Sequence, residues 1–332
     1  MNQGILSAIG HTPLIRLEKV FRENHFNLFA KLEGFNPGGS TKDRPAINII
    51  RQGLRDGEIT DRTTIIESSS GNMGIGLAQA CSYLGLRFIC VVDPKTTRQN
   101  IRLLETYGAE VDMVLTEELN GRDYLQARID RVRELKNSIE HSFWPNQYAN
   151  EANSEAHHQT MHEIAVELDG KVDYLFCATS TCGTIRGCVE YIRNHDLRTR
   201  IYAVDAVGSV IFGSRKAKRL IPGHGAAVTP RLFQDDLADK AIHITDLECV
   251  IGCRRLVGTE GILAGGSSGA VLMAAEQLRG ELRSGSNCVV IFPDRGERYL
   301  DTIYSNEWVT EHFGDVAELW ENPDEALAAS FN

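Results

Sequence analysis

The chain has 332 residues, of which 42% are hydrophobic and 24% are charged, as is ordinary for a globular protein with one large or two medium domains. Its formal net charge of −10 disfavours nucleic acid or an anionic membrane as the main partner, because both attract a basic surface. No apolar run is long enough to span a membrane, residues 1–10 lack the pattern of a signal peptide, and the eight cysteines form no regular framework. We therefore expect a cytoplasmic protein with free thiols.

The first informative stretch is FNPGGSTKDRPAINII, residues 35–50, which places Lys42 between a turn and a predicted helix. The Pro-Gly-Gly sequence breaks regular structure, and Ser40 or Thr41 can cap the helix that follows. A lysine at this point is unusual, because a cation opposes the dipole at the start of a helix. Two interpretations are open here: a solvated loop lysine, or an amine with a lowered pKa in a cleft, as a Schiff-base lysine requires.

Short apolar strands then alternate with amphipathic helices along most of the chain. This alternation predicts an α/β fold with two parallel-type sheets covered by helices, formed by units before and after about residue 145, with a cleft between them. The predicted strands are 63–69, 86–93, 109–115, 172–179, 199–206 and 287–294, and the predicted helices are 71–85, 97–108, 118–139 (as part of a charged region) and 185–195.

Three turns rich in small residues each open a helix: SSSGNMG (68–74), STCGT (180–184) and AGGSSGAV (264–271). Backbone N–H groups at a helix start, with hydroxyl groups beside them, can bind an anion. The first two turns match neither the dinucleotide fingerprint nor the P-loop, and each alone could be a tight turn packed under a sheet. Together with Lys42, the three turns indicate one phosphate-containing cofactor and an anionic substrate.

Five blocks of sequence, in this order, resemble the cysteine synthase family, whose members are fold type II enzymes that depend on pyridoxal 5'-phosphate. The blocks are KLEGFNPGGSTKDRPA, SSSGNMGIGLA, NQYANEAN, STCGT and EGILAGGSSGA. The resemblance covers about residues 4–305. It implies a tryptophan synthase β-like fold with the cofactor in the cleft between two domains. Residues 36–149 would form the smaller domain, which closes on substrate, and residues 1–35 with 150–332 the larger one. It also implies a homodimer.

The same resemblance implies which residues hold the cofactor. Lys42 would bind it covalently and would also act as the catalytic base. Asn72 would contact its 3'-oxygen, and Ser267 would face its pyridine nitrogen. The phosphate would lie on the loop of Ser180, Thr181, Cys182, Gly183 and Thr184.

The substrate carboxylate would be held by Ser69, Ser70 and Gln147. A hydroxyl group at Ser267 cannot stabilise a protonated pyridine nitrogen as an aspartate would. This favours elimination and replacement at Cβ over transamination.

Several segments differ from ordinary cysteine synthases. The loop STCGT replaces Gly-Thr-Gly-Gly-Thr, and residues 219–230 lack the usual His-Lys-Ile-Gln-Gly. Residues 204–213 also differ from the typical sulfide-using enzymes, and Arg295 occupies a position where a small residue is usual. Together they resemble the branch that converts O-phospho-L-serine and L-glutamate, through an aminoacrylate intermediate, into N-(2-amino-2-carboxyethyl)-L-glutamate. That product is a precursor of 2,3-diaminopropionate in siderophore and peptide-antibiotic biosynthesis. Arg295 and the hydroxyl-rich turns could supply the positive site that a phosphate leaving group needs.

A glutamate acceptor needs more cationic and hydroxyl groups than sulfide does, and Arg128 and Tyr148 are the candidates. Arg128 could instead be a solvated helical arginine, and Tyr148 could pack in the core. The alternative enzyme is a cysteine synthase that uses O-acetylserine or O-phosphoserine with sulfide. A catalytically silent, partner-binding subunit is the third possibility.

Two further pairs of residues lie at helical spacing. His158 and His162 could share a face toward zinc, but no third ligand is evident, so we expect no metal. Cys249 and Cys253 are expected in the core.

Overall fold

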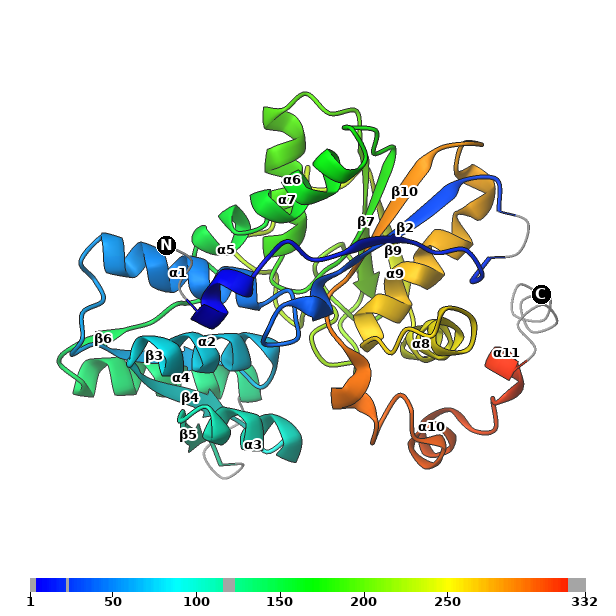
Figure 1. Cartoon of the computed structure of the whole chain (residues 1–332). Helices are drawn as coiled ribbons and strands as arrows, with labels where there is room; N and C mark the ends of the chain where they lie inside the picture. Colours follow the sequence, from blue (N-terminus) through cyan, green and yellow to red (C-terminus); the bar gives the residue numbers. More distant parts are fainter. Residues whose placement is uncertain (1–3, 22–23, 116–122, 322–332) are drawn as a thin grey trace.

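The computed structural model describes residues 4–21, 24–115 and 123–321 of the chain (Figure 1). Its strands form two sheets. The four-stranded sheet has the order β5-β4-β3-β6, all parallel, with β3 (Thr64–Ser68), β4 (Arg87–Val92), β5 (Glu110–Met113) and β6 (Ser142–Phe143). The six-stranded sheet has the order β1-β2-β10-β7-β8-β9, with β1 (Leu14–Arg16), β2 (Asn27–Leu32), β7 (Tyr174–Ala178), β8 (Arg200–Ala206), β9 (Lys240–Ile244) and β10 (Asn287–Phe292). Only the β1–β2 pair is antiparallel among these described strands.

Helices cover both sheets on their two faces. Against the smaller sheet lie α1 (Asp43–Arg55), α2 (Asn72–Leu84), α3 (Arg98–Thr106) and α4 (Tyr124–Ser138). With the larger sheet are α5 (Ala152–Glu155), α6 (His158–Glu167), α7 (Gly183–Asn194), α8 (Asp246–Glu260), α9 (Gly266–Gln277), α10 (Asn306–Phe313) and α11 (Glu318–Glu321). Short 3-10 turns are η1 (Gly4–Ala8), η2 (Glu33–Phe35), η4 (Arg279–Glu281) and η5 (Gly296–Tyr299). No described helix is long and apolar enough to cross a membrane.

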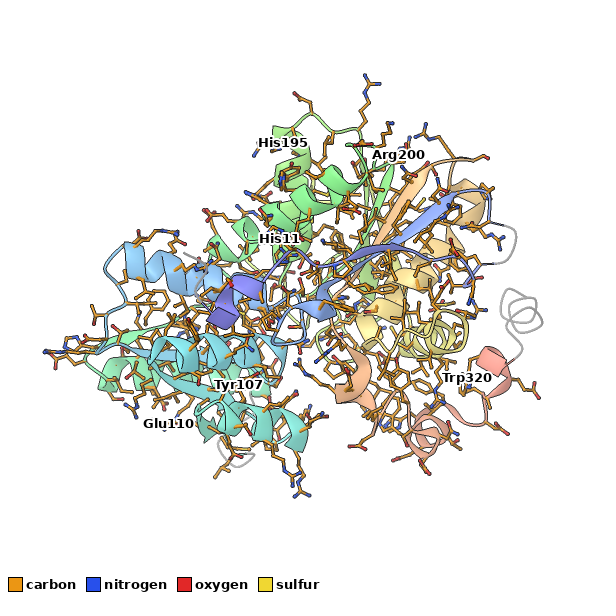
Figure 2. All side chains as sticks on the ribbon, viewed as in Figure 1. His11, Tyr107, Glu110, His195, Arg200 and Trp320 are labelled. Carbon is orange, nitrogen blue, oxygen red and sulfur yellow. The ribbon has the colours of Figure 1, made fainter. Side chains whose placement is uncertain are left out.

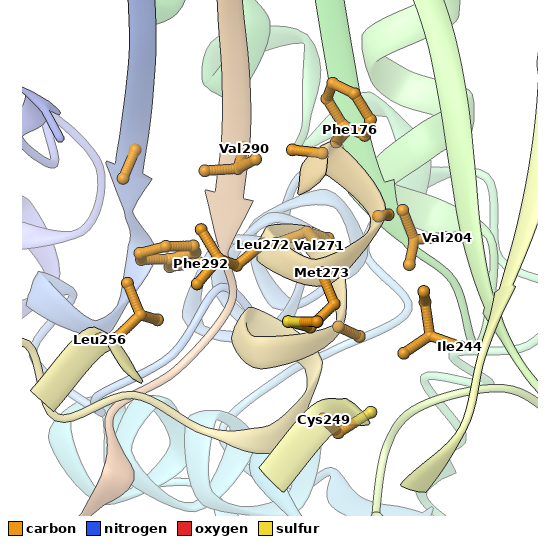
Figure 3. Packing of buried hydrophobic residues seen from close by; sticks show 14 of the residues in the cluster. Phe176, Val204, Ile244, Cys249, Leu256, Val271, Leu272, Met273, Val290 and Phe292 are labelled. Carbon is orange, nitrogen blue, oxygen red and sulfur yellow. The ribbon is translucent and has the colours of Figure 1, made fainter. Parts of the chain in front are cut away.

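The larger core lies between the six-stranded sheet and the pair α8–α9 (Figure 3). Phe176, Val290 and Phe292 point from the strands toward α9. The two helices approach closely at Gly252 and Gly269, where an added Cβ would overlap with the backbone of the other helix. Cys249 and Cys253 are fully buried in this core, as expected from the sequence.

The predicted elements are confirmed to within a few residues. In the predicted helical region 118–139, α4 runs from Tyr124 to Ser138, and residues 118–122 lie outside the described residues. The sequence analysis missed β1, β2, β6 and β9. The apolar pattern of β2 is interrupted by Lys31, which is 1% exposed. Its Nζ donates to the Thr12 carbonyl oxygen at 2.6 Å and to Glu163 Oε2 at 2.7 Å. A charged residue in a buried strand breaks the apolar run by which such strands are found.

The two sheets draw on different parts of the chain. Strands between residues 64 and 143 form the smaller sheet, whereas strands before residue 33 and after residue 173 share the larger one. The domain limits themselves, 36–149 against the rest, remain a prediction.

Candidate active site

Lys42 immediately precedes α1 and is half-buried. Burial lowers the pKa of its amine, while the nearby Asp294 carboxylate and the Cys182 thiol act in the opposite direction. A lowered pKa favours the neutral amine, which can act as a nucleophile or as a base. These surroundings match the cleft lysine rather than the solvated loop lysine.

Asp294, two residues after β10, connects the motifs that the sequence analysis treated separately. Its Oδ2 accepts hydrogen bonds from Asn72 Nδ2 at 2.8 Å and from the Tyr299 hydroxyl at 2.5 Å. Its carbonyl oxygen accepts from the Gly265 N–H at the start of α9, at 3.2 Å. Asp294 therefore lies between Lys42, the start of α2 and the start of α9. The sequence analysis missed this residue, although an acidic side chain at the end of a predicted apolar strand was a signal.

The amide of Asn72 is held from both sides. Besides the bond to Asp294, its Oδ1 accepts a hydrogen bond from the Arg298 guanidinium, which also donates to the carbonyl oxygen of Gly38. Asn72 is thus fixed beside Lys42, as required of a residue expected to contact the cofactor. Arg298 was also missed from the sequence.

The loop 180–184 leads into α7, whose start presents backbone N–H groups. Cys182 has φ +65°, a conformation that glycine adopts more readily, and its side chain is buried. A Cβ on Gly183 would overlap with Asn153 Oδ1, so only glycine fits there. The loop is therefore a close-packed cradle that suits a phosphate group.

Two buried side chains not predicted from the sequence support this loop. Asn153 Nδ2 donates to Thr181 Oγ1 at 3.3 Å and to the carbonyl oxygen of Gln147 at 2.7 Å. His157 Nε2 lies 3.2 Å from Thr184 Oγ1. Burial lowers the pKa of His157 well below its usual value, so the ring is neutral near pH 7.

Several buried polar atoms around these motifs lack a hydrogen-bond partner within the described residues, and a polar cofactor would satisfy them. They are Thr41 Oγ1, Asn153 Oδ1, Ser268 Oγ and Asp294 Oδ1. Ser267, in the first turn of α9, is also buried. The donor set, with one amine, several hydroxyl groups and a helix start, fits pyridoxal phosphate. Lys42 would hold its aldehyde, residues 180–184 its phosphate and Ser267 its ring nitrogen.

The turn after β3 carries the two serines predicted to hold the substrate carboxylate. Ser69 is buried and its Oγ accepts from the Gly74 N–H at 2.9 Å, while the Ser70 carbonyl accepts from Asn100 Nδ2 at 3.0 Å. Gln147 reaches the same turn, since its Nε2 donates to the Ser68 carbonyl at 3.3 Å. The structure therefore brings all three predicted carboxylate-binding residues together.

Glu67 is a fully buried carboxylate beneath this turn. It accepts hydrogen bonds from Trp144 Nε1 at 3.0 Å and from the Gln147 N–H at 3.1 Å, as well as from Ser68 N–H at 2.7 Å. Arg128 interacts electrostatically with Glu67, and Tyr148 interacts with both Arg128 and Glu67. The two candidate acceptor residues thus lie close to the carboxylate-binding residues.

Arg128 is only 8% exposed and forms an ion pair with Asp93, with Nε and Oδ2 3.2 Å apart. The interpretation as a solvated arginine is therefore wrong. Tyr148 is half-buried, and burial raises the pKa of its hydroxyl.

Replacing Glu67 by glutamine should change how stability depends on pH. Burial, partly offset by its hydrogen bonds, raises the pKa of Glu67 from 4.5 to about 7. Between these values the folded state binds more protons than the unfolded state, so this group's contribution to stability falls as pH rises through that window. Glutamine cannot titrate but keeps an acceptor oxygen. Relative to wild type, Glu67→Gln should gain up to roughly 3 kcal/mol between pH 5 and 8. Urea unfolding of both holoenzymes across this range checks it, and parallel profiles would contradict it.

Residues 219–230, one of the segments expected to differ from ordinary cysteine synthases, pack against this site. The Gly225 N–H donates to the Thr179 carbonyl at 2.7 Å, next to the phosphate loop. An added Cβ on Gly266 would overlap with Ile221. The segment also buries His224, whose pKa burial lowers to about 3, so its ring is neutral. These contacts place the divergent segment where it can shape the site.

His158 and His162 do not share a partner. His158 Nε2 lies 2.9 Å from Glu190 Oε2, and His162 Nδ1 lies 2.9 Å from the Tyr191 hydroxyl. Within residues 4–21, 24–115 and 123–321, no group of three His, Cys, Asp or Glu side chains could hold a metal ion.

Comparison with solved structures finds similar whole chains. The O-acetylserine-dependent cystathionine β-synthase of Helicobacter pylori is 33% identical, with 91% of this chain and 98% of that chain covered and a TM-score of 0.83. A hydrogen sulfide-producing enzyme of Fusobacterium nucleatum is 31% identical, covering 90% and 98%, with a TM-score of 0.84. The cysteine synthase of Entamoeba histolytica is 30% identical, covering 99% and 96%, with a TM-score of 0.88.

Residues 5–294 match the family described as pyridoxal-phosphate dependent enzymes. This range contains Lys42, Asn72, the loop 180–184 and Ser267, and it ends at Asp294, on which these motifs converge. The chain belongs to the family of pyridoxal-phosphate-dependent enzymes.

Proposed function

We propose that the protein catalyses β-replacement of O-phospho-L-serine by the amine of L-glutamate, giving N-(2-amino-2-carboxyethyl)-L-glutamate and phosphate. The observation that carries this proposal is the position of Arg128 and Tyr148. Both interact electrostatically with the buried Glu67 carboxylate, which accepts a hydrogen bond from the Gln147 N–H next to the turn expected to bind the donor carboxylate. A buried guanidinium beside that turn suits an anionic acceptor better than sulfide.

The residues divide the reaction between them. Ser69, Ser70 and Gln147 bind the donor carboxylate and orient the Cα–H bond. The cofactor, when bound, supplies an electron sink that makes the Cα proton acidic. Lys42 accepts that proton with its amine, and burial, by lowering the pKa of the amine, favours the neutral form that this step requires.

The Cβ–O bond then breaks as phosphate leaves, and the neutral glutamate amine forms a bond to Cβ and gives up one proton to the phosphate or to solvent. Lys42 returns its proton to Cα. Glutamate has two carboxylates, so a site that selects it must hold at least one of them. Arg128 can offer a guanidinium and Tyr148 a hydroxyl, which burial keeps protonated. The product would serve as a precursor of 2,3-diaminopropionate in siderophore biosynthesis.

A cysteine synthase that uses O-acetylserine or O-phosphoserine with sulfide is the second candidate. The names of two relatives favour it, since one is described as dependent on O-acetylserine and another as a cysteine synthase. One experiment distinguishes the two proposals. The holoenzyme is incubated with a donor and either L-glutamate or sulfide, and the products are identified by mass spectrometry. Exclusive formation of cysteine would reject the glutamate proposal.

The donor should be O-phospho-L-serine rather than O-acetyl-L-serine. The hydroxyl-rich turns and Arg295 can stabilise the charge of a dianionic leaving group. Arg295 lies near Gly39, three residues before Lys42. One charge-assisted hydrogen bond corresponds to about a 10- to 150-fold preference. Stopped-flow absorbance of the first half-reaction with each donor measures it. A faster reaction with the acetyl compound would reverse the assignment.

We also propose a cytoplasmic homodimer. Ile5 in η1 and Tyr83 in α2 are both 45% exposed, although these elements contact each other. Apolar side chains that adjoin on the surface suit a contact between subunits. Sedimentation equilibrium of Tyr83→Glu and wild type tests this, because a dimer through this face should be weakened in the variant.

A further inference from the structure

A cavity of about 220 Å³ lies between the turn at 37–39, helices α2 and α3, and η5. Gln99 and Tyr107 line it from α3, and Arg295, Glu297 and Arg298 line it from the opposite side. Tyr107, labelled in Figure 2, lies at the end of α3 beside α2. The lining includes none of the residues assigned above to the cofactor or to the donor carboxylate, but it does include Arg295, proposed above to stabilise the leaving phosphate.

Two guanidinium groups converge over Gly39 in this cavity. A Cβ built on Gly39 would lie 3.1 Å from Arg298 Nη2 and 3.6 Å from both Nε and Nη2 of Arg295. Gly39 has φ +85°, which favours glycine, so this space is left without a side chain. Two cations so close together favour an anion between them, although the Asp43 and Asp294 carboxylates already act on Arg298.

The surroundings of the two arginines differ. Arg298 is oriented by its bonds to Asn72 Oδ1 and to the Gly38 carbonyl. Arg295 forms an ion pair with Glu297 at 3.7 Å, where both side chains are more than half exposed. An exposed ion pair of this kind contributes little free energy, so Glu297 does not fix the position of the Arg295 side chain. One guanidinium is thus prepositioned, and the other is available to close on a ligand.

We propose that this cavity binds a small oxyanion, a phosphate or a carboxylate group, between Arg295 and Arg298. Guanidinium groups donate two parallel hydrogen bonds to such oxygens, and the Tyr107 hydroxyl and Gln99 amide add neutral donors. Inorganic phosphate is the product of the donor half-reaction. This link to catalysis rests on the proposed function, whereas the site itself does not. Through Arg298 the anion would lie one side chain away from Asn72.

Calorimetric titration of the holoenzyme with inorganic phosphate, without donor, tests the site. We expect saturable binding that weakens by about 10- to 150-fold in Arg295→Gln, because one charge-assisted contact is lost. Arg102→Gln is the matched control, since Arg102 is exposed on α3 and does not line the cavity. Its affinity should equal that of wild type. Equal affinity in Arg295→Gln and wild type, or no saturable binding in the millimolar range, would overturn the proposal.

A competition arm identifies the source of the oxyanion. If L-glutamate displaces phosphate, and its own binding also depends on Arg295, the cavity takes an amino-acid carboxylate. If it does not displace phosphate, the cavity takes phosphate. Because these titrations involve no turnover, they can fail while O-phospho-L-serine is still the donor, and they can succeed if it is not.

Discussion

Replacing Lys42 by alanine is expected to abolish turnover while leaving the fold intact. The amine is placed beside Asp294 and the loop 180–184, and burial lowers its pKa. Loss of a general base alone costs about 100- to 10,000-fold in rate. The same substitution removes the group expected to bind the cofactor covalently, so the measured loss should be at the upper end of this range or beyond. Steady-state assays with saturating cofactor measure it.

The control for this experiment is Lys136→Ala, because Lys136 is an exposed lysine in the last turn of α4. It should retain wild-type activity. Circular dichroism and thermal unfolding of Lys42→Ala should show a folded protein, since the half-buried side chain is not part of a described core cluster. Near-normal activity of Lys42→Ala without added amines would reject the assignment of Lys42.

Arg128→Ala should reduce the use of L-glutamate by about 10- to 150-fold. This is the effect of removing one charge-assisted contact, roughly 1.5–3 kcal/mol. The first half-reaction with the donor precedes acceptor binding, so its rate should be nearly unchanged. Stopped-flow absorbance of each half-reaction separates the two effects. Equal slowing of both half-reactions would show that Arg128 does not act on the acceptor.

Because Arg128 also pairs with the buried Asp93, its removal leaves a carboxylate without its partner, which can destabilise the fold. Arg128→Lys keeps a positive charge near Asp93 but cannot form a bidentate contact with a carboxylate. This variant should stay folded and still lose glutamate use. Arg131→Ala is the matched control on the same helix, since Arg131 pairs at the surface with Asp112 and Glu134. Wild-type use of glutamate by Arg128→Lys would contradict the proposed contact between Arg128 and a glutamate carboxylate.

Much of the fold followed from local pattern. Parallel strands such as β3 and β7 are buried on both faces, and they are short apolar runs that the sequence displays directly. The turns that open α2, α7 and α9 were also evident, because a run of small residues between a predicted strand and a predicted helix is typical of a tight turn. By contrast, β2 was hidden by Lys31, whose charge is balanced by Glu163, a residue 132 positions away. A balancing partner so distant in sequence cannot be found from local pattern.

The sequence by itself determined the α/β class, the motifs and, through their resemblance to a family, dependence on pyridoxal phosphate. Only the tertiary structure decided how the motifs meet. Asp294 joins Lys42, Asn72 and the start of α9, and Glu67 draws Gln147 to the carboxylate turn beside Arg128. The physical reason is that these contacts join the ends of different strands, far apart along the chain. Burial, which shifts the pKa of Lys42 and Glu67, likewise exists only once the sheets and helices have packed.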